Sequence, residues 1–596
     1  MPKRSVYLDF IRQAYRRDLP RLKEEVNRWR SAFDPKNALF GYTVTRYPLM
    51  VAAVAAFLYE LDGDPALAQT ALQNLLCFRE FTKLYPEEEA RLRPEYKDGI
   101  PPLDNCFDPV VFAPACERIR SAVTPQEYDA LAGIMADSLR MTWLFPEWGG
   151  HNRAMLRAAS LACCARAFPH HPQAADWVRL ADELAEESWG RWSIEDAMMY
   201  QSHWLRSMIL YAEARGKVDE LAQQLPARLH IRAMPQLMSP LGVLPDFGDS
   251  HWLMHSPWEW LAVMEWGAKT YGDPSMKWAV ERIWEAQGSE TPNLYAATVL
   301  MLAYRWGSDD VPAAPPPPTL DALDDLVIKK LVFRTGWDRN AAYACVNYRD
   351  EGDYGLVARD YLRTNLAVSA EKMHHGHSDE GSFVLLMHNG SILLHESGYR
   401  ESPPDGIYRA DLYHNRLIWR ERVRLPEEDV MQVLRDNGHY KPARTQRLYQ
   451  TQLLDAQFSR VRTTDEINGL QWDRSIIFLP ELPAWVVIDS ALALRPHPRT
   501  FSCLWWTTDI LRQGEDWFET RISHIQTWQN PSLSSLRIVM PPLKGQSGTI
   551  QVVPMRRCFQ DELLISHSWS GHHLPGRVVN FVTLLYPHTD GEEEDI

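Results

Sequence analysis

The sequence predicts an α+β multidomain protein, with an all-helical N-terminal domain and a C-terminal domain of antiparallel β-sheets. Three observations support this fold class. Helix-start signals recur through residues 1–310, short apolar runs of strand length recur through residues 320–596, and a proline-rich segment at 311–319 separates the two patterns. Consecutive prolines cannot donate backbone hydrogen bonds and favour a stiff, extended chain. We therefore expect two domains joined by a linker at 311–319.

The first domain shows repeated helix starts and no alternating strand pattern. Residues 47–61 form an apolar-rich stretch of helical length that ends at Gly63, and Asp64-Pro65 begins the next helix with an N-cap and a first-turn proline. Thr124 to Glu127 is a capping box, and Asp273-Pro274 repeats the Asp-Pro start. Helices joined by short turns predict stacked antiparallel pairs. Such pairs can form a bundle, a solenoid or a closed α/α toroid.

The second domain contains short β-rich runs with turn residues between them. They lie at 342–348, 382–387, 391–395, 475–479, 484–488 and 578–586. Asn389-Gly390 separates the second run from the third, and this pair favours a two-residue hairpin because both turn positions need positive φ. The runs predict stacked antiparallel sheets. The hairpin would bring Glu396 back beside His377.

Histidine and carboxylate side chains concentrate around this hairpin. Residues 371–415 include His374, His375, His377, Asp379, His395, Glu396 and His414. A lone His-x-His is more often a feature of a strand surface, but the nearby carboxylate and the later His-Asn pair favour a functional centre. Two imidazoles and one carboxylate form a plausible ligand set for a divalent metal ion.

Composition and charge narrow the classes of partner. The 596 residues are 45% hydrophobic and 24% charged, with a formal net charge of −15. This charge argues against a general nucleic-acid or anionic-membrane binder, although a local basic cleft for an acidic polysaccharide remains possible on an acidic protein. The 23 Trp and 23 Tyr suit sugar stacking, although most are expected in the core. The eight cysteines have no metal-type spacing and are expected to be reduced core residues.

Targeting signals are also weak. The N-terminus has a basic start but no apolar signal-peptide core, and no run of eighteen apolar residues occurs. We expect a soluble protein that is cytoplasmic, or exported with its signal absent from this chain. Oligomeric state is not predicted.

The cluster around the hairpin resembles a known family. His375-Gly-His377-Ser-Asp379, the Gly390 turn, Glu396-Ser-Gly-Tyr399 and His414-Asn415 are similar to the C-terminal signature of the heparinase II/III-like polysaccharide lyases. The resemblance implies an α/α toroid followed by a β-sandwich. It further implies that His375 is catalytic and that His377, Glu396 and His414 hold a structural metal ion, for which Zn²⁺ or Mn²⁺ suits the ligands. Glu396 stands where an Asp is usual in the family.

The helical half offers a candidate cradle for a carboxylate. His151, Asn152 and Arg153 follow a Gly-Gly turn at a predicted helix N-terminus. Free N–H groups and the helix dipole favour an anion there. The simpler interpretation is that Asn152 only caps the helix. Further candidates for lining the cleft are Arg46, Trp148, Tyr408, Arg409 and the loop 244–252.

A tyrosine in the helical half completes the predicted site. Tyr200 lies forty-eight residues after Asn152, and His203 follows one helical turn later on the same face. A buried tyrosine is usually a packing residue. The family resemblance, however, implies that Tyr200 is the catalytic tyrosine, with His203 beside it.

These residues together predict a polysaccharide lyase that acts by β-elimination on a uronic acid, with glycosaminoglycans favoured by family analogy. Asn152 would neutralise the substrate carboxylate, and Tyr200 with His375 would move protons. Two alternatives remain open. The first is a glycoside hydrolase that uses a carboxylate pair from Glu195, Asp196, Asp246 and Asp249. The second is a sugar-binding protein without catalytic activity.

Overall fold

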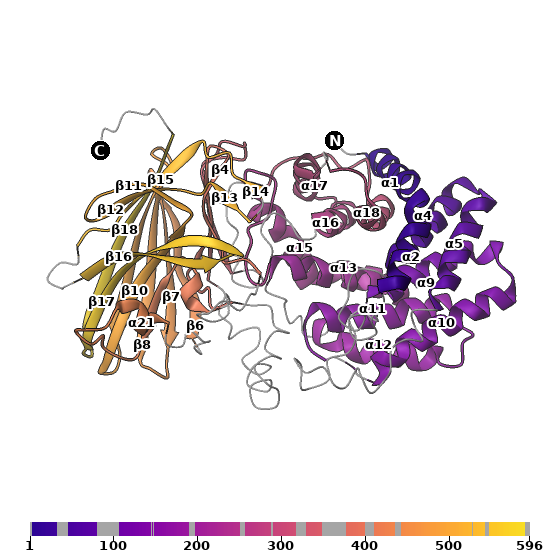
Figure 1. The fold of residues 1–596 in the computed structure, drawn as a ribbon, viewed down its shortest axis with the longest axis horizontal. Helices are drawn as coiled ribbons and strands as arrows, with labels where there is room; N and C mark the ends of the chain where they lie inside the picture. Colours follow the sequence, from indigo (N-terminus) through magenta and orange to yellow (C-terminus); the bar gives the residue numbers. More distant parts are fainter. Residues whose placement is uncertain are drawn as a thin grey trace.

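The computed structural model places a helical half beside a β-sheet half (Figure 1). It describes residues 3–32, 46–79, 107–144, 146, 148–189, 197–250, 257–287, 290–317, 329–348, 377–399, 410–435, 443–526, 528–542 and 548–589. The helices of the first half are α1 (Arg4–Asp18), α2 (Leu22–Ala32), α4 (Arg46–Asp62), α5 (Pro65–Cys77), α9 (Pro109–Ile119), α10 (Pro125–Leu144), α11 (Asn152–Ala167), α12 (Ala174–Trp189), α13 (Met198–Arg215), α14 (Val218–Gln223), α15 (Leu225–Leu237), α16 (Pro257–Tyr271), α17 (Pro274–Gln287) and α18 (Leu294–Trp306).

The predicted helix starts are confirmed where the structure describes them. The Asp64 carboxylate accepts from Ala66 N at 2.9 Å at the start of α5. At the start of α10, Thr124 N donates to Glu127 Oε2 at 2.8 Å and Glu127 N donates to Thr124 Oγ1 at 3.2 Å, which is a reciprocal capping box. These side chains satisfy amide groups that have no partner within the helix.

Six helices close a ring. Helix α4 packs on α9, α9 on α11, α11 on α13, α13 on α16, α16 on α18, and α18 packs back on α4. Other helices cover the ring from outside, with α5 on α4, α12 on α11, and α17 on α16. This closure distinguishes the α/α toroid from the bundle and the solenoid, and the predicted fold class is confirmed.

The strands of the second half form antiparallel sheets. They are β1 (Lys330–Arg334), β2 (Tyr343–Asn347), β3 (Phe383–His388), β4 (Ser391–His395), β5 (Leu417–Arg420), β6 (Ala443–Leu453), β7 (Ala456–Asp465), β8 (Leu470–Leu479), β9 (Ala484–Ala493), β10 (His497–Thr507), β11 (Asp509–Gln513), β12 (Trp517–Arg521), β13 (His524–Ile525), β14 (Trp528–Gln529), β15 (Ser534–Val539), β16 (Gly548–Arg557), β17 (Gln560–His573) and β18 (Val578–Thr589). The sheet orders are β1-β2-β3-β4, β16-β17-β10-β5, β11-β12-β15-β18-β9-β8-β7-β6, and β13-β14. A short helix, α21 (Val430–Leu434), follows β5.

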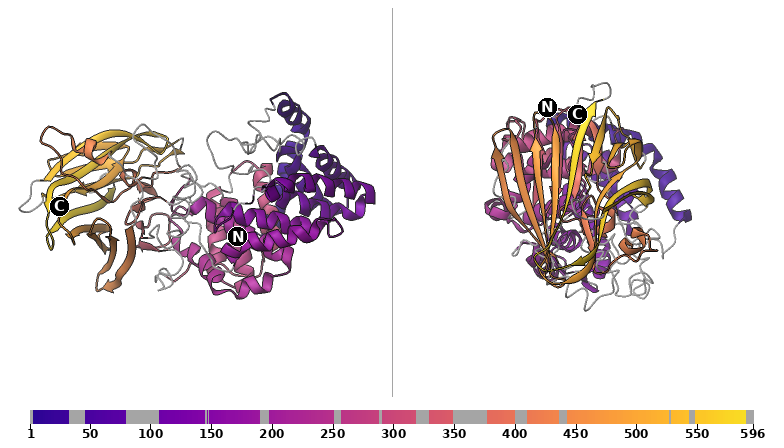
Figure 2. Two further views of the ribbon diagram at one scale, coloured as in Figure 1. Left: turned by 90° about the horizontal axis from the view of Figure 1, so that it is seen from below. Right: turned by 90° about the vertical axis from the view of Figure 1, so that its left-hand side faces the viewer.

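The small sheet β1–β4 lies between the ring and the other sheets, and the left view of Figure 2 shows the two halves side by side. One set of its side chains, including Val332, Tyr343 and Val384, belongs to the helical core. The alternate set, including Phe333 and Phe383, joins the core of the β-sandwich. Successive side chains of a strand point to opposite faces, so a sheet buried on both faces needs continuous apolar runs.

Hydrogen bonds fix this sheet to the ring. Tyr343 Oη donates to Leu237 O at 2.7 Å, and Arg334 donates to Met238 O at 3.2 Å and to Gln236 O at 2.5 Å. Apolar packing and buried hydrogen bonds therefore hold the two halves together. Among the described helices, none is long and apolar enough to cross a membrane.

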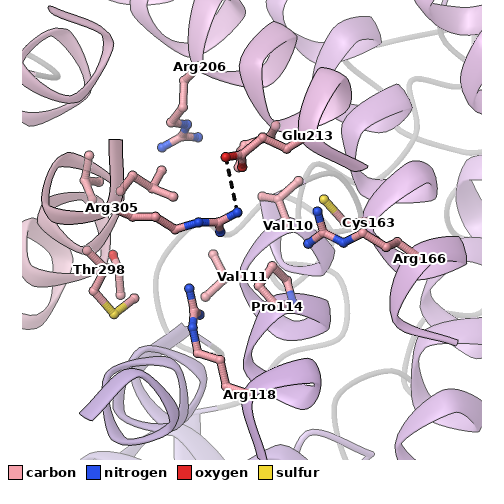
Figure 3. A pocket seen from close by; sticks show the side chains of 14 residues that line it. Val110, Val111, Pro114, Arg118, Cys163, Arg166, Arg206, Glu213, Thr298 and Arg305 are labelled. Atoms are coloured by element: carbon pink, nitrogen blue, oxygen red, sulfur yellow. Dashed lines mark ion pairs between the residues drawn. The ribbon is translucent and has the colours of Figure 1, made fainter. Parts of the chain in front are cut away.

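The two ends of the ring differ in chemistry. Glu259 and Tyr295, in the first turns of α16 and α18, meet near one end of the ring, and Glu259 also contacts Arg206 in the middle of α13. Residues near the C-terminal ends of α9, α11, α13 and α18 meet around a cavity lined by arginines (Figure 3). The N-terminal end faces the candidate active site.

Candidate active site

The β side of the site is built on the predicted hairpin, which the structure confirms. Strands β3 and β4 pair antiparallel, with His388 opposite Ser391 across the turn. Asn389 and Gly390 have φ values of 47° and 72°, as a type I′ turn requires. The hairpin places Glu396, directly after β4, next to the loop that carries His377. Ser397 Oγ lies 3.3 Å from His377 Nδ1.

The three residues predicted to bind metal come together. The Glu396 carboxylate contacts His414 Nδ1 directly, and the His377 and His414 rings have centroids 5.3 Å apart. Ser382 Oγ donates to the other carboxylate oxygen of Glu396 at 2.5 Å. All three predicted ligands are buried. The close approach of these residues depends on the hairpin, because Glu396 is nineteen positions after His377.

A loop of the helical half reaches the same place. Asp249 Oδ1 lies 3.8 Å from His377 Nε2, and Asp249 is fully buried. Burial, together with the nearby carboxylates of Glu396 and Asp249, raises the pKa of the neighbouring Asp246 to about 7. The loop 244–252 therefore supplies carboxylates that border the histidines. This loop was predicted as a possible lining of the cleft, and Asp246 and Asp249 were predicted as candidates for a hydrolase carboxylate pair.

The electrostatics favour an ionised Glu396. Burial alone would raise its pKa, but His414 and the hydrogen bonds from His414 and Ser382 outweigh burial and lower the pKa below its usual value. A carboxylate that is charged, buried and next to two imidazoles is suited to coordinate a cation.

The donor set fits a divalent metal ion. Two imidazoles with one or two carboxylates suit Zn²⁺ or Mn²⁺. Nε2 of His414 is buried and has no hydrogen-bond partner among the residues that the structure describes. A buried polar atom without a partner is costly, and a bound ion would satisfy it. Glu396 and His414 are already in contact, so they would have to separate slightly to share an ion.

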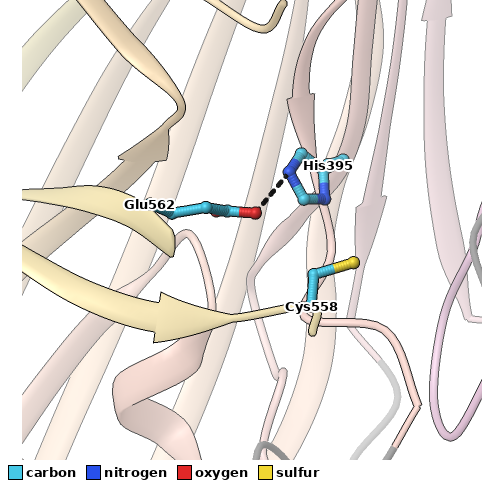
Figure 4. Close-up of side chains that lie close together, drawn as sticks. All are labelled: His395, Cys558 and Glu562. Atoms are coloured by element: carbon cyan, nitrogen blue, oxygen red, sulfur yellow. Dashed lines mark ion pairs between the residues drawn. The ribbon is translucent and has the colours of Figure 1, made fainter. Parts of the chain in front are cut away.

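A second group of potential ligands lies behind Glu396 (Figure 4). His395, Cys558 and Glu562 place their donor atoms within 4.8 Å of one another, which is closer together than the three predicted ligands lie. Arg557 already contacts it, with Nη2 3.3 Å from His395 Nε2 and Nε 2.9 Å from Glu562 Oε2. Burial and the Glu562 carboxylate raise the pKa of the Cys558 thiol. We therefore interpret this group as support for the site.

Arg557 bonds the chain just before two of the predicted ligands. It donates to the carbonyl of His395 at 3.2 Å and to the carbonyl of Tyr413 at 3.0 Å. These residues immediately precede Glu396 and His414. Burial would raise the pKa of Glu562, but Arg557 and His395 lower it to about 2, so the ion pair that holds Arg557 stays charged. The guanidinium thus links the two ligand-bearing loops through their backbones.

Two glycines of the motif explain how closely these loops pack. Gly381 has a φ of 75°, and a Cβ there would lie 2.5 Å from the Trp472 ring. Gly398 has a φ of 80°, and a Cβ there would lie 3.0 Å from Cys558 Sγ. A larger residue at either position would be strained and would push the loop away from its support.

The helical side of the site includes the start of α11. His151 is the N-cap residue, since its Nδ1 accepts from Ala154 N at 3.4 Å, and its Nε2 lies 3.1 Å from Trp148 O. Asn152 is the first residue of the helix and is buried, Arg153 is half-buried, and the Trp148 side chain is exposed. The helix therefore presents its N-terminus here, but the capping side chain is His151 and not Asn152.

Tyr200 joins the two halves. It lies in the first turn of α13, and its hydroxyl is 2.9 Å from the hydroxyl of Tyr399. Tyr399 is three residues after Glu396, on the same loop. Tyr200 is half-buried. The predicted catalytic tyrosine of the ring is thus in contact with the loop that carries a predicted metal ligand.

His203 lies one helical turn beyond Tyr200 and faces a buried acid. Its Nδ1 is 3.9 Å from Glu259 Oε1. The same oxygen accepts from Tyr295 Oη at 2.9 Å and from Arg206 Nη1 at 3.3 Å. Glu259 is fully buried. This buried carboxylate therefore lies close to His203.

Several predicted residues cannot be placed. His374, His375, Tyr408, Arg409, Glu195 and Asp196 lie outside the described residues. Arg46 begins α4, but its side chain is outside the described part. Of the hydrolase candidates, Asp246 and Asp249 are described. Both are buried against the predicted metal ligands.

Three functional candidates were missed by sequence reasoning. Tyr399 was in the family motif but had no assigned role. Glu259 had a weak signal, since it is an acid between two tryptophans in the first turn of an apolar-rich helix. Arg557 had no signal in the sequence, because its partners His395 and Tyr413 lie more than 140 positions away.

Comparisons with solved structures support the fold. The chain is similar to heparan sulfate lyase HepC from Pedobacter heparinus, with a TM-score of 0.53 and 14% identity over 91% of this chain and 76% of that one. It is also similar to a crystal structure of heparinase III, with a TM-score of 0.58 and 13% identity over 90% and 76% of the two chains. No family model and no curated protein matches the sequence. The chain therefore has a heparinase III-like polysaccharide lyase fold.

Proposed function

We propose that the protein is a polysaccharide lyase that cleaves a uronic-acid-containing polysaccharide, most favourably a glycosaminoglycan, by β-elimination. The observation that carries this proposal is the contact of Tyr200 with Tyr399 at 2.9 Å. Tyr200, which we propose as a proton-transfer group, contacts the loop that follows Glu396. Domain interfaces are common places for substrate clefts. The heparinase III-like fold supports the same reaction class.

The first requirement of the reaction is neutralisation of the substrate carboxylate. Removal of the proton at C5, next to the carboxylate, creates an enolate-like dianion that the enzyme must stabilise. Asn152 lies at the N-terminus of α11, where the amide groups and the helix dipole favour negative charge. Asn152 would donate to the carboxylate, with Arg153 beside it. His151 is engaged as the cap and would fix the start of the helix.

The second requirement is proton transfer at C5 and at the departing O4. Tyr200 would take the C5 proton and His375 would act as its acid/base partner, or the two would exchange these roles. Tyr399 would donate a hydrogen bond to the Tyr200 oxygen and so stabilise it when it is deprotonated. His203, held by Glu259, would keep the face of α13 polar next to Tyr200. Trp148, Tyr408 and Arg46 would line the path of the sugar chain.

The proposed metal ion would be held by His377, Glu396 and His414, with Asp249 close enough to contribute a further oxygen. When bound, it would supply fixed positive charge that orders the loops. Tyr399 is three residues after Glu396 on one of these loops, and His375 is two positions before His377 in the sequence. The metal ligands would therefore position the reacting groups and would not themselves move protons.

A substrate panel tests the reaction class. Heparin, heparan sulfate, chondroitin, dermatan, hyaluronan and alginate should each be incubated with the protein, with ultraviolet absorbance and reducing ends followed together. A lyase produces an unsaturated uronate that absorbs in the ultraviolet, together with new reducing ends. Reducing ends without absorbance would identify a hydrolase. Binding without either product would identify a sugar-binding protein and contradict the proposal.

A pair of histidine variants tests the separate roles of two neighbouring residues. We expect His377→Ala to lose bound Zn²⁺ or Mn²⁺ in elemental analysis, because it removes one of the few ligands. We expect His375→Ala to keep the metal and the melting temperature but to lose turnover. His572→Ala, at an exposed position, is the control. Equal and negligible metal in all samples would contradict the metal assignment, and a large fall in the melting temperature of His375→Ala would make that residue structural.

A further inference from the structure

The helical ring contains a second concentration of charge, which includes arginines in the last turns of three of its helices. A cavity of about 60 Å³ lies between α9, α11, α13 and α18 (Figure 3). Each of these helices contributes one arginine to its wall: Arg118, Arg166, Arg206 and Arg305. Among the described residues that line it, Glu213 is the acidic one. The lining therefore has an excess of positive charge.

The arginines have carboxylate partners, but these partners do not use all of their donors. Arg118 pairs with Glu60 at 2.9 Å, Arg206 with Glu259 at 3.3 Å, and Arg305 with Glu213 at 3.2 Å, while Arg166 holds Glu117 through two nitrogens at 2.8 and 2.7 Å. Glu60, Glu117 and Glu259 do not line the cavity. A guanidinium carries five N–H donors. Each arginine therefore keeps donors beyond those that its carboxylate engages.

Helix ends explain where the arginines are but not why they converge. Arg118, Arg166 and Arg305 lie in the last turns of their helices, where a cation is favourable. An arginine with that role alone can extend into solvent. Here the side chains of Arg118 and Arg206 are only 9% and 10% exposed. Burial, with Arg305 nearby, lowers the pKa of Arg118 even though Glu60 opposes the change. Positive charges crowded in a poorly solvated space favour an anion between them.

We propose that this cavity binds one small tetrahedral oxyanion, such as sulfate or phosphate. Arginine is well suited to oxyanions because its planar fork of donors matches two oxygen atoms at once. A single water needs about 10–15 Å³ of this kind of volume, so the cavity has space for about four waters or for one anion of five heavy atoms. A sugar ring would not fit. The Arg166 and Arg305 side chains, 28% and 41% exposed, mark the side that opens to solvent.

The cavity is distinct from the proposed substrate site. Arg206 is the residue between them, since it lines the cavity and also contacts Glu259, the acid behind His203. The inference concerns binding and stability of the ring, so it does not depend on the proposed lyase activity. Loss of either proposal would leave the other intact.

Thermal unfolding of the full chain in rising sulfate tests the proposal. A ligand that binds only the native state raises the melting temperature. The rise grows with the logarithm of the ratio of ligand concentration to dissociation constant. We expect a rise of about 3 °C when sulfate exceeds this constant tenfold, given the size of the helical half. Phosphate should behave like sulfate. Chloride and acetate, compared at equal ionic strength, should give smaller rises because they cannot contact all four arginines.

Variants at the cavity should change this response in opposite directions. Arg305→Gln and Arg118→Gln remove a donor and should weaken sulfate binding about tenfold or more. Glu213→Gln removes the carboxylate that competes for the same guanidinium and should strengthen sulfate binding. Arg179→Gln, on the exposed face of α12 beside Asp176 and Glu183, removes one arginine elsewhere and should respond like the wild type.

Two results would overturn the proposal. One is a melting temperature that rises linearly with sulfate and equally in all four variants, since that is a general salt effect. The other is isothermal calorimetry of the wild type with sulfate and with phosphate that detects no saturable binding. The calorimetry uses the unmodified protein, so it decides the question even if a cavity variant fails to fold.

Discussion

The two sides of the candidate active site are held in different ways. On the β side, His377, Glu396 and His414 are buried, and side chains from other strands bond the backbone around them. On the helical side, Tyr200 is half-buried, and its hydroxyl lies 2.9 Å from the Tyr399 hydroxyl across the interface. The two sides therefore differ in how firmly their side chains are held. The β side is held by buried contacts, while the proposed proton-transfer group of the helical side, Tyr200, is half-buried.

Buried arginines account for the rigidity of the β side. Arg416 donates to Ser378 O at 2.7 Å, Arg474 to Gly381 O at 2.6 Å, and Arg557 to Tyr413 O at 3.0 Å. Each is paired with a buried carboxylate, which is Glu380, Asp489 or Glu562. Burying an ion pair rarely adds net stability, because desolvation offsets the attraction. The gain here is in the positions of the loop carbonyls, which in turn set the directions of the predicted ligands.

The largest effect on activity is expected from a substitution on the helical side, at Tyr200. Tyr200→Phe keeps the ring and its packing but removes the hydroxyl. General acid/base catalysis contributes about 10²–10⁴ in rate, so kcat on the best polysaccharide should fall at least a hundredfold. The melting temperature should change little, since the hydroxyl is not part of the core.

The matched control for Tyr200→Phe is Tyr59→Phe, on another helix of the ring. The Tyr59 hydroxyl lies 3.4 Å from Ser121 Oγ in an exposed contact. Steady-state kinetics should show wild-type kcat for this control. A Tyr200→Phe enzyme with near-normal kcat and raised KM would instead make Tyr200 a binding residue, and would move the proton-transfer role to His203 or His375.

The next largest effect is expected on the β side. Glu562→Gln removes the charge that pairs with Arg557 and leaves a buried guanidinium without its carboxylate. Breaking a buried pair in this way costs about 3–5 kcal/mol. Denaturant unfolding should show this loss in the β half, and elemental analysis should show less bound metal, since the loops before Glu396 and His414 lose their link. The exposed Glu481→Gln, at the turn after β8, should change neither quantity. Unchanged stability and metal content in Glu562→Gln would show that the Arg557 link is dispensable.

Contacts within one segment and contacts between distant segments also differ in how well the sequence predicted them. The hairpin depends on Asn389 and Gly390 themselves, and the capping box of α10 depends on Thr124 and Glu127, so local patterns were sufficient. The contact of His377 with Asp249 and that of Tyr200 with Tyr399 join residues more than 120 positions apart. Such contacts depend on how the small sheet docks on the ring. The sequence did not predict whether the helices close into a ring, for the same reason. Each helix signal is local, whereas closure depends on contacts among all six helices.

Acid should lower the stability of the β half, by a smaller amount than Glu562→Gln does. Burial lowers the pKa of His567, in β17, from its ordinary value to about 4. The folded state therefore prefers the neutral imidazole. The stability that this preference provides is present above the unfolded pKa of about 6.5, and it is lost as pH falls from there to about 4. The difference in pKa corresponds to about 3 kcal/mol.

The test compares stability against pH in two histidine variants. His567→Gln cannot be protonated, so its free energy of unfolding should fall less between pH 6.5 and 4 than that of the wild type. His572→Gln, at an exposed position of the same strand, should follow the wild type. Equal slopes for all three proteins would mean that the β half tolerates a charged His567, and acid would then not separate the two halves.

The smallest effect should come from the contact that joins the two sides. Tyr399→Phe removes the hydroxyl that lies 2.9 Å from the Tyr200 hydroxyl and leaves both rings in place. One hydrogen bond has a net value of about 0.5–1.5 kcal/mol, which corresponds to a loss of up to about tenfold in kcat. A double-mutant cycle then shows whether Tyr399 acts through Tyr200. If Tyr399 acts by stabilising the Tyr200 oxygen, adding Tyr399→Phe to Tyr200→Phe should cause no further loss. If the losses multiply, Tyr399 contacts the substrate independently, and the β side contributes a reacting group as well as geometry.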